Sequence, residues 1–129
     1  MGVSAEVIPG HAPLTLRCAP HTSWRRTELY FGLSQPDGSV LTPQTWQRFV
    51  DETITPRFPD GLTVFEGHGQ WRNMQGQILA EPNRVLVLIY PASQELARHA
   101  DIEAIRTSYR NRFHQESVLR TDSCVAAAF

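Results

Sequence analysis

The segment Arg26–Leu33, with the sequence RTELYFGL, decides the fold because its side chains alternate between two characters. An alternation with a period of two predicts a β-strand, since successive side chains of a strand point to opposite faces. One face carries the apolar set, which consists of Thr27, Leu29, Phe31 and Leu33. The other face carries Arg26, Glu28, Tyr30 and Gly32. We therefore expect a strand with the core on one side and functional groups on the other.

The next part of the chain predicts a helix. Thr42 supplies a capping hydroxyl and Pro43 suits the first helical position, where no backbone N–H is needed. Apolar residues then recur at helical spacing, namely Trp46, Phe49, Val50 and Ile54. Pro56 ends the pattern.

Residues 61–90 predict a long hairpin whose bends lie at glycines. Its return strand, Arg84–Tyr90 (RVLVLIY), is a continuous apolar run that favours burial on both faces. A second helix is expected after Ser93, its predicted cap, with an apolar stripe that ends at Phe113, and a last strand is expected over 117–125.

This order of elements predicts an α+β fold, the ferredoxin-like β-α-β-β-α-β arrangement. We expect a four-stranded antiparallel sheet with two helices on one face. Residues 24–129 are assigned to this single domain. Residues 1–23 are assigned to an N-terminal arm, because Pro9-Gly10, Pro13 and Pro20 interrupt regular structure there.

Composition and motifs argue against several classes of function. A net charge of −1 gives no electrostatic basis for nucleic-acid binding, and no stretch approaches the roughly 20 apolar residues that span a membrane. No phosphate loop or dinucleotide motif is present, so we expect no cofactor. Without a secretory signal pattern, the expected location is cytoplasmic. Cys18 and Cys124 are expected to be free thiols, and a disulfide between them is the less favoured alternative.

Glu28 and Tyr30 are the first candidates for chemistry, because they lie side by side on the polar face of the first strand. A carboxylate and a phenol in a partly apolar cavity suit a base and a proton donor, with the pKa of the glutamate raised by desolvation. The alternative is a structural ion pair of Glu28 with Arg26 or Arg120.

The hairpin supplies a second group of candidates. His68 lies between two glycines, and Glu66, Trp71 and Glu81 are expected in the same neighbourhood, at the entrance to a site. The alternative is a wide turn in which Trp71 only covers the edge of the core. Glu66, His68 and Glu81 also offer metal ligands, but no HxH or HExxH spacing supports a metal site. The other histidines are expected to be exposed, namely His11, His21, His99 and His114.

Arg57, which follows the first helix, is assigned to either of two roles. It caps the helix carbonyls, or it binds an anionic group of a substrate.

These features lead to two hypotheses about function. The first is a small-molecule-binding homodimer, in which cofactor-free acid–base chemistry such as isomerisation, cyclisation or elimination uses Glu28, Tyr30 and His68. The second is a non-catalytic interaction module, in which the same residues determine fold and association. The dimer is expected because the apolar run at Arg84–Tyr90 requires a cover on the face opposite the helices.

Two longer motifs carry a resemblance to a known family. Thr27–Gly32 (TELYFG) and Arg57–Thr63 (RFPDGLT) resemble the signature segments of a bacterial domain-of-unknown-function family. Three shorter segments also look like its members, namely Gly69–Trp71, Arg84–Leu88 and Phe113–Val118. The resemblance implies a small single-domain bacterial protein and supplies no reaction. Many relatives look exported or lipid-anchored, a signal that this chain lacks, which favours a cytoplasmic variant in small-molecule biosynthesis.

Overall fold

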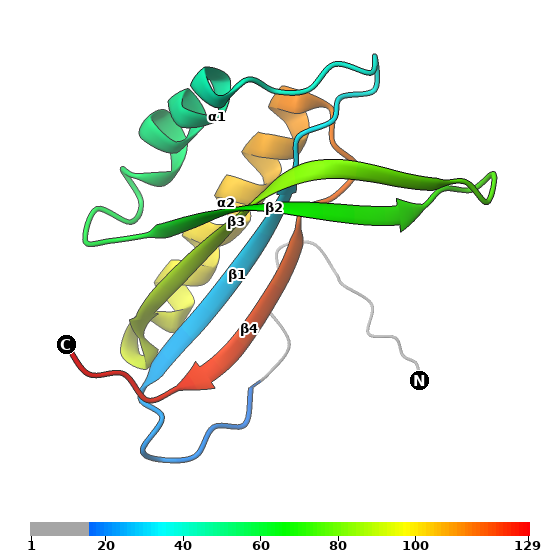
Figure 1. Cartoon of the computed structure of the whole chain (residues 1–129). Helices are drawn as coiled ribbons and strands as arrows, with labels where there is room; N and C mark the ends of the chain where they lie inside the picture. The colour runs from blue at the N-terminus through cyan, green and yellow to red at the C-terminus, as the bar shows by residue number, and fades with distance from the viewer. Residues whose placement is uncertain (1–15) are drawn as a thin grey trace.

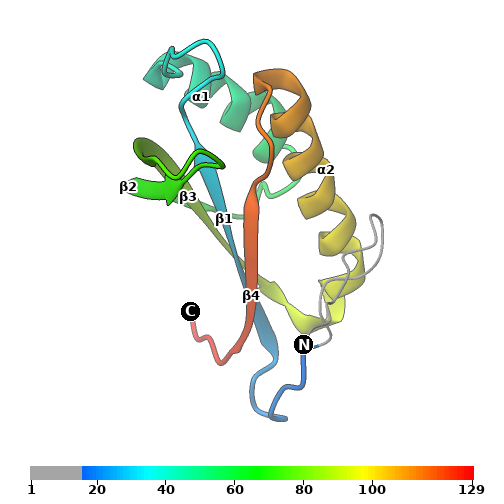
Figure 2. The same ribbon diagram turned by 90° about the vertical axis from the view of Figure 1, so that its right-hand side faces the viewer.

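The computed structural model describes residues 16–129, so most of the predicted N-terminal arm lies outside the described residues. The sheet contains β1 (Trp24–Gly32), β2 (Thr63–Arg72), β3 (Ile78–Pro91) and β4 (Leu119–Val125) (Figure 1). Its strands are antiparallel in the order β2-β3-β1-β4. The helices are α1 (Pro43–Phe49) and α2 (Glu95–Phe113), and Figure 2 shows α2 along one face of the sheet. The predicted ferredoxin-like α+β fold is confirmed.

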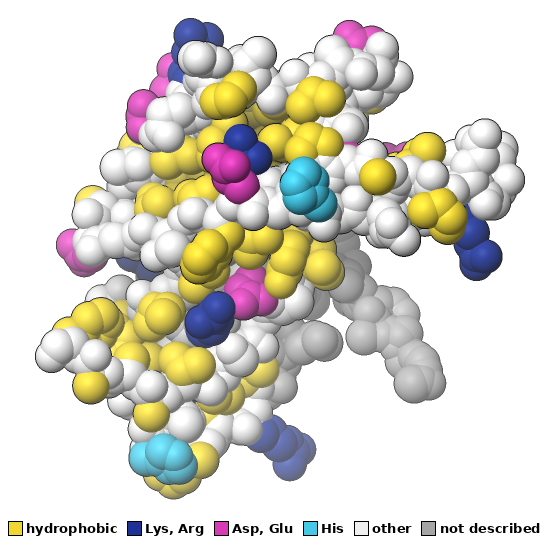
Figure 3. Space-filling view, viewed as in Figure 1, with side chains coloured by type: hydrophobic (Ala, Val, Ile, Leu, Met, Phe, Trp, Pro, Cys, Tyr) yellow, Lys and Arg dark blue, Asp and Glu magenta, His cyan; other side chains and the backbone are white. Residues whose placement is uncertain are grey.

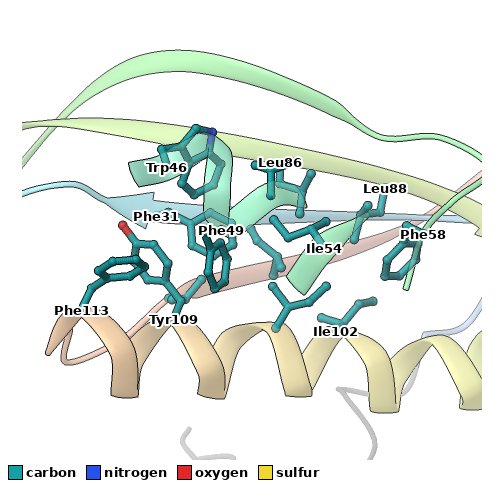
Figure 4. Close-up of a cluster of buried hydrophobic side chains, with 14 of the residues drawn as sticks. Phe31, Trp46, Phe49, Ile54, Phe58, Leu86, Leu88, Ile102, Tyr109 and Phe113 are labelled. Atoms are coloured by element: carbon teal, nitrogen blue, oxygen red, sulfur yellow. The ribbon is translucent and has the colours of Figure 1, made fainter. Parts of the chain in front are cut away.

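β1 is a central strand, and the predicted division of its two faces is correct. Thr27, Leu29 and Phe31 are fully buried on the side of the helices. Figure 4 shows Phe31 among aromatic side chains from both helices, and its ring centroid lies 4.7 Å from that of Tyr109. Such aromatic contacts contribute about 0.5–1.5 kcal/mol each beyond the burial of their area. Burial of one face of β1 thus fixes which side chains remain on the other.

The first helix begins as its sequence predicts. The Oγ1 of Thr42 accepts a hydrogen bond from Thr45 N at 3.1 Å, and Pro43 is the first helical residue. The helix then continues as one π-helical segment, Val50–Ile54. Gly61, with a φ of 154°, lies in the loop that leads into β2.

The second helix begins differently from its prediction. Ser93 is not its cap, because it lies inside the 3₁₀ turn Ala92–Gln94 that precedes α2. The helix ends at His114, which adopts the left-handed conformation at a φ of 55°. The last strand is shorter than expected, since β4 begins at Leu119.

The face of the sheet opposite the helices is called the open face here, because no described helix covers it. Apolar side chains gather on it in Figure 3, and those assigned to this face by the strand register are Phe65, Val85, Val87, Ile89 and Leu119. Phe65 is 56% exposed and Leu119 58% exposed. The prediction that Arg84–Tyr90 is buried on both faces therefore holds for its middle, Leu86–Leu88, and is wrong for the exposed Ile89.

The cysteines and one histidine also differ from expectation. Cys18 and Cys124 form a disulfide with their Cα atoms 5.7 Å apart, so the expectation of free thiols is wrong. His99 was expected to be exposed but is buried, with its Nδ1 3.0 Å from Arg120 Nη1. Its side chain faces the sheet from α2 because β4 supplies it with a polar partner.

Candidate binding site

Glu28 lies at the centre of a polar cluster on the open face. Its Oε2 accepts hydrogen bonds from Arg26 Nη2 at 2.8 Å and Nε at 3.1 Å. Its Oε1 accepts from Tyr30 Oη at 2.9 Å and from Thr121 Oγ1 at 3.1 Å. We call Arg26, Glu28, Tyr30 and Thr121 the Glu28 cluster. Both candidate residues of β1 thus belong to one hydrogen-bonded group, and the ion pair of Glu28 with Arg26 is present.

The protonation states of this cluster differ from those expected of a desolvated base. Hydrogen bonds from Arg26 and then Tyr30 hold the pKa of Glu28 below its usual range, so the predicted rise is wrong. The hydrogen bond to Glu28 raises the pKa of Tyr30. At neutral pH the pair is therefore a carboxylate and a protonated phenol that donates to it.

A hollow of about 490 Å³ lies at the free end of β3, and we call it the β3-edge hollow. Its volume falls within the range of about 300–1,000 Å³ that is usual for small-molecule sites. Four aromatic side chains line it, together with the loop of the RFPDGLT motif and the start of α2: Trp24, Phe58, Pro59, Asp60, Gly61, Leu62, Thr63, Val87, Ile89, Tyr90, Pro91, Gln94, Arg98 and Phe129. Its walls are thus mostly apolar, with few polar groups.

Arg98 is the cation of this hollow. Its guanidinium carbon lies 5.4 Å from the centroid of the Phe58 ring, within the range of a cation–π contact. Its Nη2 lies 2.7 Å from Asp101 Oδ2, whereas its buried Nε has no hydrogen-bond partner among the described residues. The buried Nε cannot reach a ligand, but Nη1 pairs with no described residue and provides a donor at the wall of this aromatic hollow.

The backbone of β3 adds a donor and an acceptor to the same hollow. Leu33 N donates to Pro82 O at 3.1 Å, so even-numbered residues of β3 hydrogen-bond to β1 and odd-numbered residues face β2. β2 begins at Thr63, opposite Val87. The N–H and C=O of Ile89 therefore point to an edge at which no described strand continues.

The Glu28 cluster and the β3-edge hollow adjoin each other. In the register of β1 and β3, Glu28 is opposite Val87 and Arg26 is opposite Ile89, and both apolar residues line the hollow. Directly opposite residues of antiparallel strands have Cβ atoms about 4.5–5.5 Å apart. A ligand that extends from the hollow across Val87 would thus meet the Glu28 cluster.

The other candidate residues do not join this site. Glu66 and His68 lie on the face of β2 that is turned towards the helices, because they pair with Arg84 and Pro82. Trp71 shares the open face with Glu28, but it lies in the part of the hairpin that extends beyond β1 (Figure 1). The predicted neighbourhood of hairpin residues is therefore divided between two faces.

Glu81 and Arg57, which were candidates for ligand binding, instead form hydrogen bonds to the backbone of the protein. Glu81 Oε2 accepts from Ser34 N at 3.1 Å, and its carboxylate lies so close to Gly32 that an added Cβ there would be 2.7 Å from Oε1. Glu81 lies on the opposite face from Glu66 and His68, so these three side chains cannot share a metal ion. Arg57 Nη1 donates to Thr53 O at 2.8 Å, which is the capping role.

Sequence reasoning missed Phe58, Ile89, Tyr90 and Arg98 as site residues. The RFPDGLT motif was a usable signal, since a long motif in a loop indicates that the loop has a specific role. Nothing in the sequence indicates that β2 begins only opposite Val87, so that the last residues of the apolar run of β3 have no partner in β2 and the edge is open.

The chain belongs to the family described as "Protein of unknown function (DUF3574)", whose model matches residues 26–129. A comparison with curated proteins found no match. Among the described residues, no helix is long and apolar enough to cross a membrane.

Solved structures with a similar fold include a phage SAM lyase in complex with S-methyl-5′-thioadenosine. It has a TM-score of 0.62 and 18% identity, and the match covers 88% of this chain and 89% of that one. CutA from Synechococcus elongatus PCC7942 has a TM-score of 0.53 and 9% identity, with 83% and 80% covered. The periplasmic divalent cation tolerance protein CutA from Archaeoglobus fulgidus has a TM-score of 0.52 and 6% identity, with 82% and 87% covered. At these identities the likeness shows the fold alone.

Proposed function

We propose that this chain is a small-molecule-binding domain that holds a planar, ring-bearing ligand of nucleoside size in the β3-edge hollow. The observation that carries the proposal is the composition of that hollow, where aromatic walls surround an arginine and a free backbone donor–acceptor pair. Sites for small molecules typically combine apolar walls with a few placed polar groups.

Each wall of the hollow has a role in this proposal. Phe58 and Tyr90 offer faces or edges for an aromatic ring, and Arg98 offers a donor for a polar or anionic substituent. The N–H and C=O of Ile89 match an adjacent acceptor and donor on a heteroaromatic ring, such as those of adenine. The nucleoside in the phage SAM lyase complex supports the choice of this ligand class.

We propose further that two copies associate through their open faces. The exposed apolar side chains of this face, among them Phe65 and Leu119, form a surface that a second copy would bury. The Glu28 cluster would then lie at the interface, beside the ligand. In this arrangement the second copy would bury the open face of β3, so that the apolar run of β3 would be buried on both faces.

Charged substitutions on the open face test this association. The double variant Phe65→Glu/Leu119→Glu is expected to elute as a monomer at a protein concentration at which the unchanged chain is a dimer, because it places carboxylates in an apolar interface. The measurement is size-exclusion chromatography with light scattering. Leu96→Glu is the matched control, because Leu96 is 79% exposed on α2 and lies on the other side of the sheet. A monomeric unchanged chain contradicts the dimer.

Acid–base chemistry without a cofactor is the second candidate function, and the hydrogen bond from Tyr30 to Glu28 favours it. The ionised Glu28 would accept a proton from a ligand, and Tyr30 would supply one. The phage SAM lyase makes SAM the first compound to try. Loss of SAM in the presence of the unchanged chain, but not of the Glu28→Gln variant, supports an enzyme. Binding of adenosine with no loss of SAM supports a function in binding alone.

Binding of adenosine tests the proposed site. We expect adenosine to bind by isothermal titration calorimetry, and Arg98→Ala to weaken it at least about tenfold, or about 1.4 kcal/mol. Arg110→Ala is the matched control, since Arg110 is an exposed arginine of the same helix. Circular dichroism would confirm that both variants fold. Equal affinities of Arg98→Ala and Arg110→Ala, or no binding to the unchanged chain, would contradict the proposed site.

A further inference from the structure

A second hollow, of about 340 Å³, lies between α1 and β2, and we call it the α1–β2 hollow. It shares only Leu62 with the β3-edge hollow, and its lining residues are Pro43, Trp46, Gln47, Val50, Leu62, Val64, Glu66 and Arg84. Its walls are apolar except at Gln47, Glu66 and Arg84. None of the roles assigned above uses it.

Arg84 is a partly buried cation whose guanidinium has few partners. Its side chain is only 12% exposed, and its one hydrogen bond to a described residue runs from Nη1 to the carbonyl of the preceding Asn83, at 3.2 Å. Its Nη2 lies 3.9 Å from Oε2 of Glu66, a carboxylate that is 83% exposed. Buried charges are normally paired and hydrogen-bonded, because desolvation is costly. None of the Arg84 nitrogens is itself buried without a partner, and the fork retains donors that no described residue accepts.

Trp46 contributes a second donor without an acceptor. Its side chain is largely buried, but its indole nitrogen is not among the buried, unpaired polar atoms of residues 16–129, so the N–H is accessible. Figure 4 shows the indole nitrogen on the side of the ring turned away from Phe31 and Phe49. The hollow therefore has two donors, on Arg84 and on Trp46, that are open to an acceptor of a ligand.

We propose that the α1–β2 hollow binds the carboxylate of a small aliphatic acid. The planar guanidinium of Arg84 matches a carboxylate through two parallel hydrogen bonds, and the Trp46 N–H is a further donor. Val50, Leu62 and Val64 surround a short apolar tail. One arginine with Glu66 at its rim suits a monoanion and disfavours a phosphate dianion, because the glutamate repels the extra charge. The carboxylate of the ligand replaces Glu66 as the partner of Arg84, because an exposed ion pair contributes only about 0–1 kcal/mol.

This site is independent of the proposed function. It uses the face of β2 turned towards the helices, whereas the Glu28 cluster lies on the open face. Failure of adenosine to bind would leave it standing, and failure of a carboxylate to bind would leave the β3-edge hollow unaffected.

The experiment follows the indole N–H signals of the chain, which has three tryptophans, by two-dimensional NMR during titration with sodium butanoate. Trp46→Phe assigns the signal of Trp46. We expect that signal to shift and saturate, while those of Trp24 and Trp71 remain in place. Butanamide, which has the same shape without the charge, is expected to bind at least about tenfold more weakly. An unmoved Trp46 signal, or equal binding of amide and acid, overturns the proposal.

Arg84→Gln tests the guanidinium itself. We expect it to abolish saturation with butanoate, whereas Arg72→Gln, an equal change of charge at an exposed position of the same hairpin, leaves the titration unchanged. If Arg84→Gln does not fold, Arg84→Lys keeps the charge and removes the fork, and is expected to weaken binding about tenfold or more. Full affinity in either Arg84 variant overturns the proposal.

Discussion

Replacing Arg120 by alanine is expected to lower the free energy of unfolding by about 3–5 kcal/mol, because it leaves the largely buried carboxylate of Asp122 without its cation. The side chain of Arg120 is 6% exposed. Its Nε donates to both carboxylate oxygens of Asp122, at 3.2 and 3.1 Å, and its Nη1 donates to Glu103 Oε2 at 2.8 Å. Urea unfolding measures the effect. Arg110→Ala, at an exposed position, is expected to change stability by less than about 0.5 kcal/mol.

The same ion network gives a dependence on pH. Burial acts to raise the pKa of Glu103, but hydrogen bonds from Arg106 and Arg120 outweigh it and hold that pKa below its usual value. The resulting stabilisation is complete above the usual pKa of a glutamate and is lost as the pH falls through the lowered value. Without Arg120 one of the lowering contacts is gone, so the variant should begin to lose stability at higher pH than the unchanged chain. If the acid-unfolding curves of the variant and of the unchanged chain coincide after each is scaled to its own total change in stability, this account is contradicted.

Removal of the disulfide is expected to have a comparably large effect. Cys18 and Cys124 are 106 positions apart in the sequence, and closing a loop of that length contributes about 4–5 kcal/mol in the chain-entropy model. The double variant Cys18→Ser/Cys124→Ser should therefore melt at a clearly lower temperature in calorimetry. Dithiothreitol should lower the melting temperature of the unchanged chain towards that of the variant and leave the variant unaffected. Two titratable thiols in the unchanged chain, prepared without reductant, would contradict the disulfide.

The disulfide also bears on where the protein acts. Disulfides form and persist in oxidising compartments and are rare in a reducing cytoplasm. The pairing of Cys18 with Cys124 therefore favours an oxidising compartment over the cytoplasmic location expected from sequence.

The sequence predicted the fold because its strongest signals are local. The alternation at Arg26–Leu33 identified both faces of β1, and Thr42 with Pro43 identified the start of α1. These features follow from backbone geometry over a few residues, so they do not depend on knowledge of the tertiary structure.

The site was only partly predictable because it depends on register and on contacts between distant residues. Glu28 and Tyr30 were placed correctly on the open face, but the division of Glu66 and His68 from them follows from the pairing of β2 with β3. The desolvation expected for Glu28 is outweighed by a neighbour two residues away, Arg26, which the sequence showed only as an alternative partner. The β3-edge hollow exists because β2 begins only at Thr63, opposite Val87, and no local pattern in the sequence indicates this start.

The most direct test of the central claim is to locate bound adenosine by amide chemical shifts in the folded chain. We predict that saturating adenosine shifts the amide signal of Ile89 most strongly, together with those of Tyr90 and Gly61, because these residues line the β3-edge hollow. Signals from the far end of the hairpin, around Met74, should not move. Shifts that cluster outside the hollow, or no shift at saturating adenosine, would contradict the claim that this hollow is the binding site.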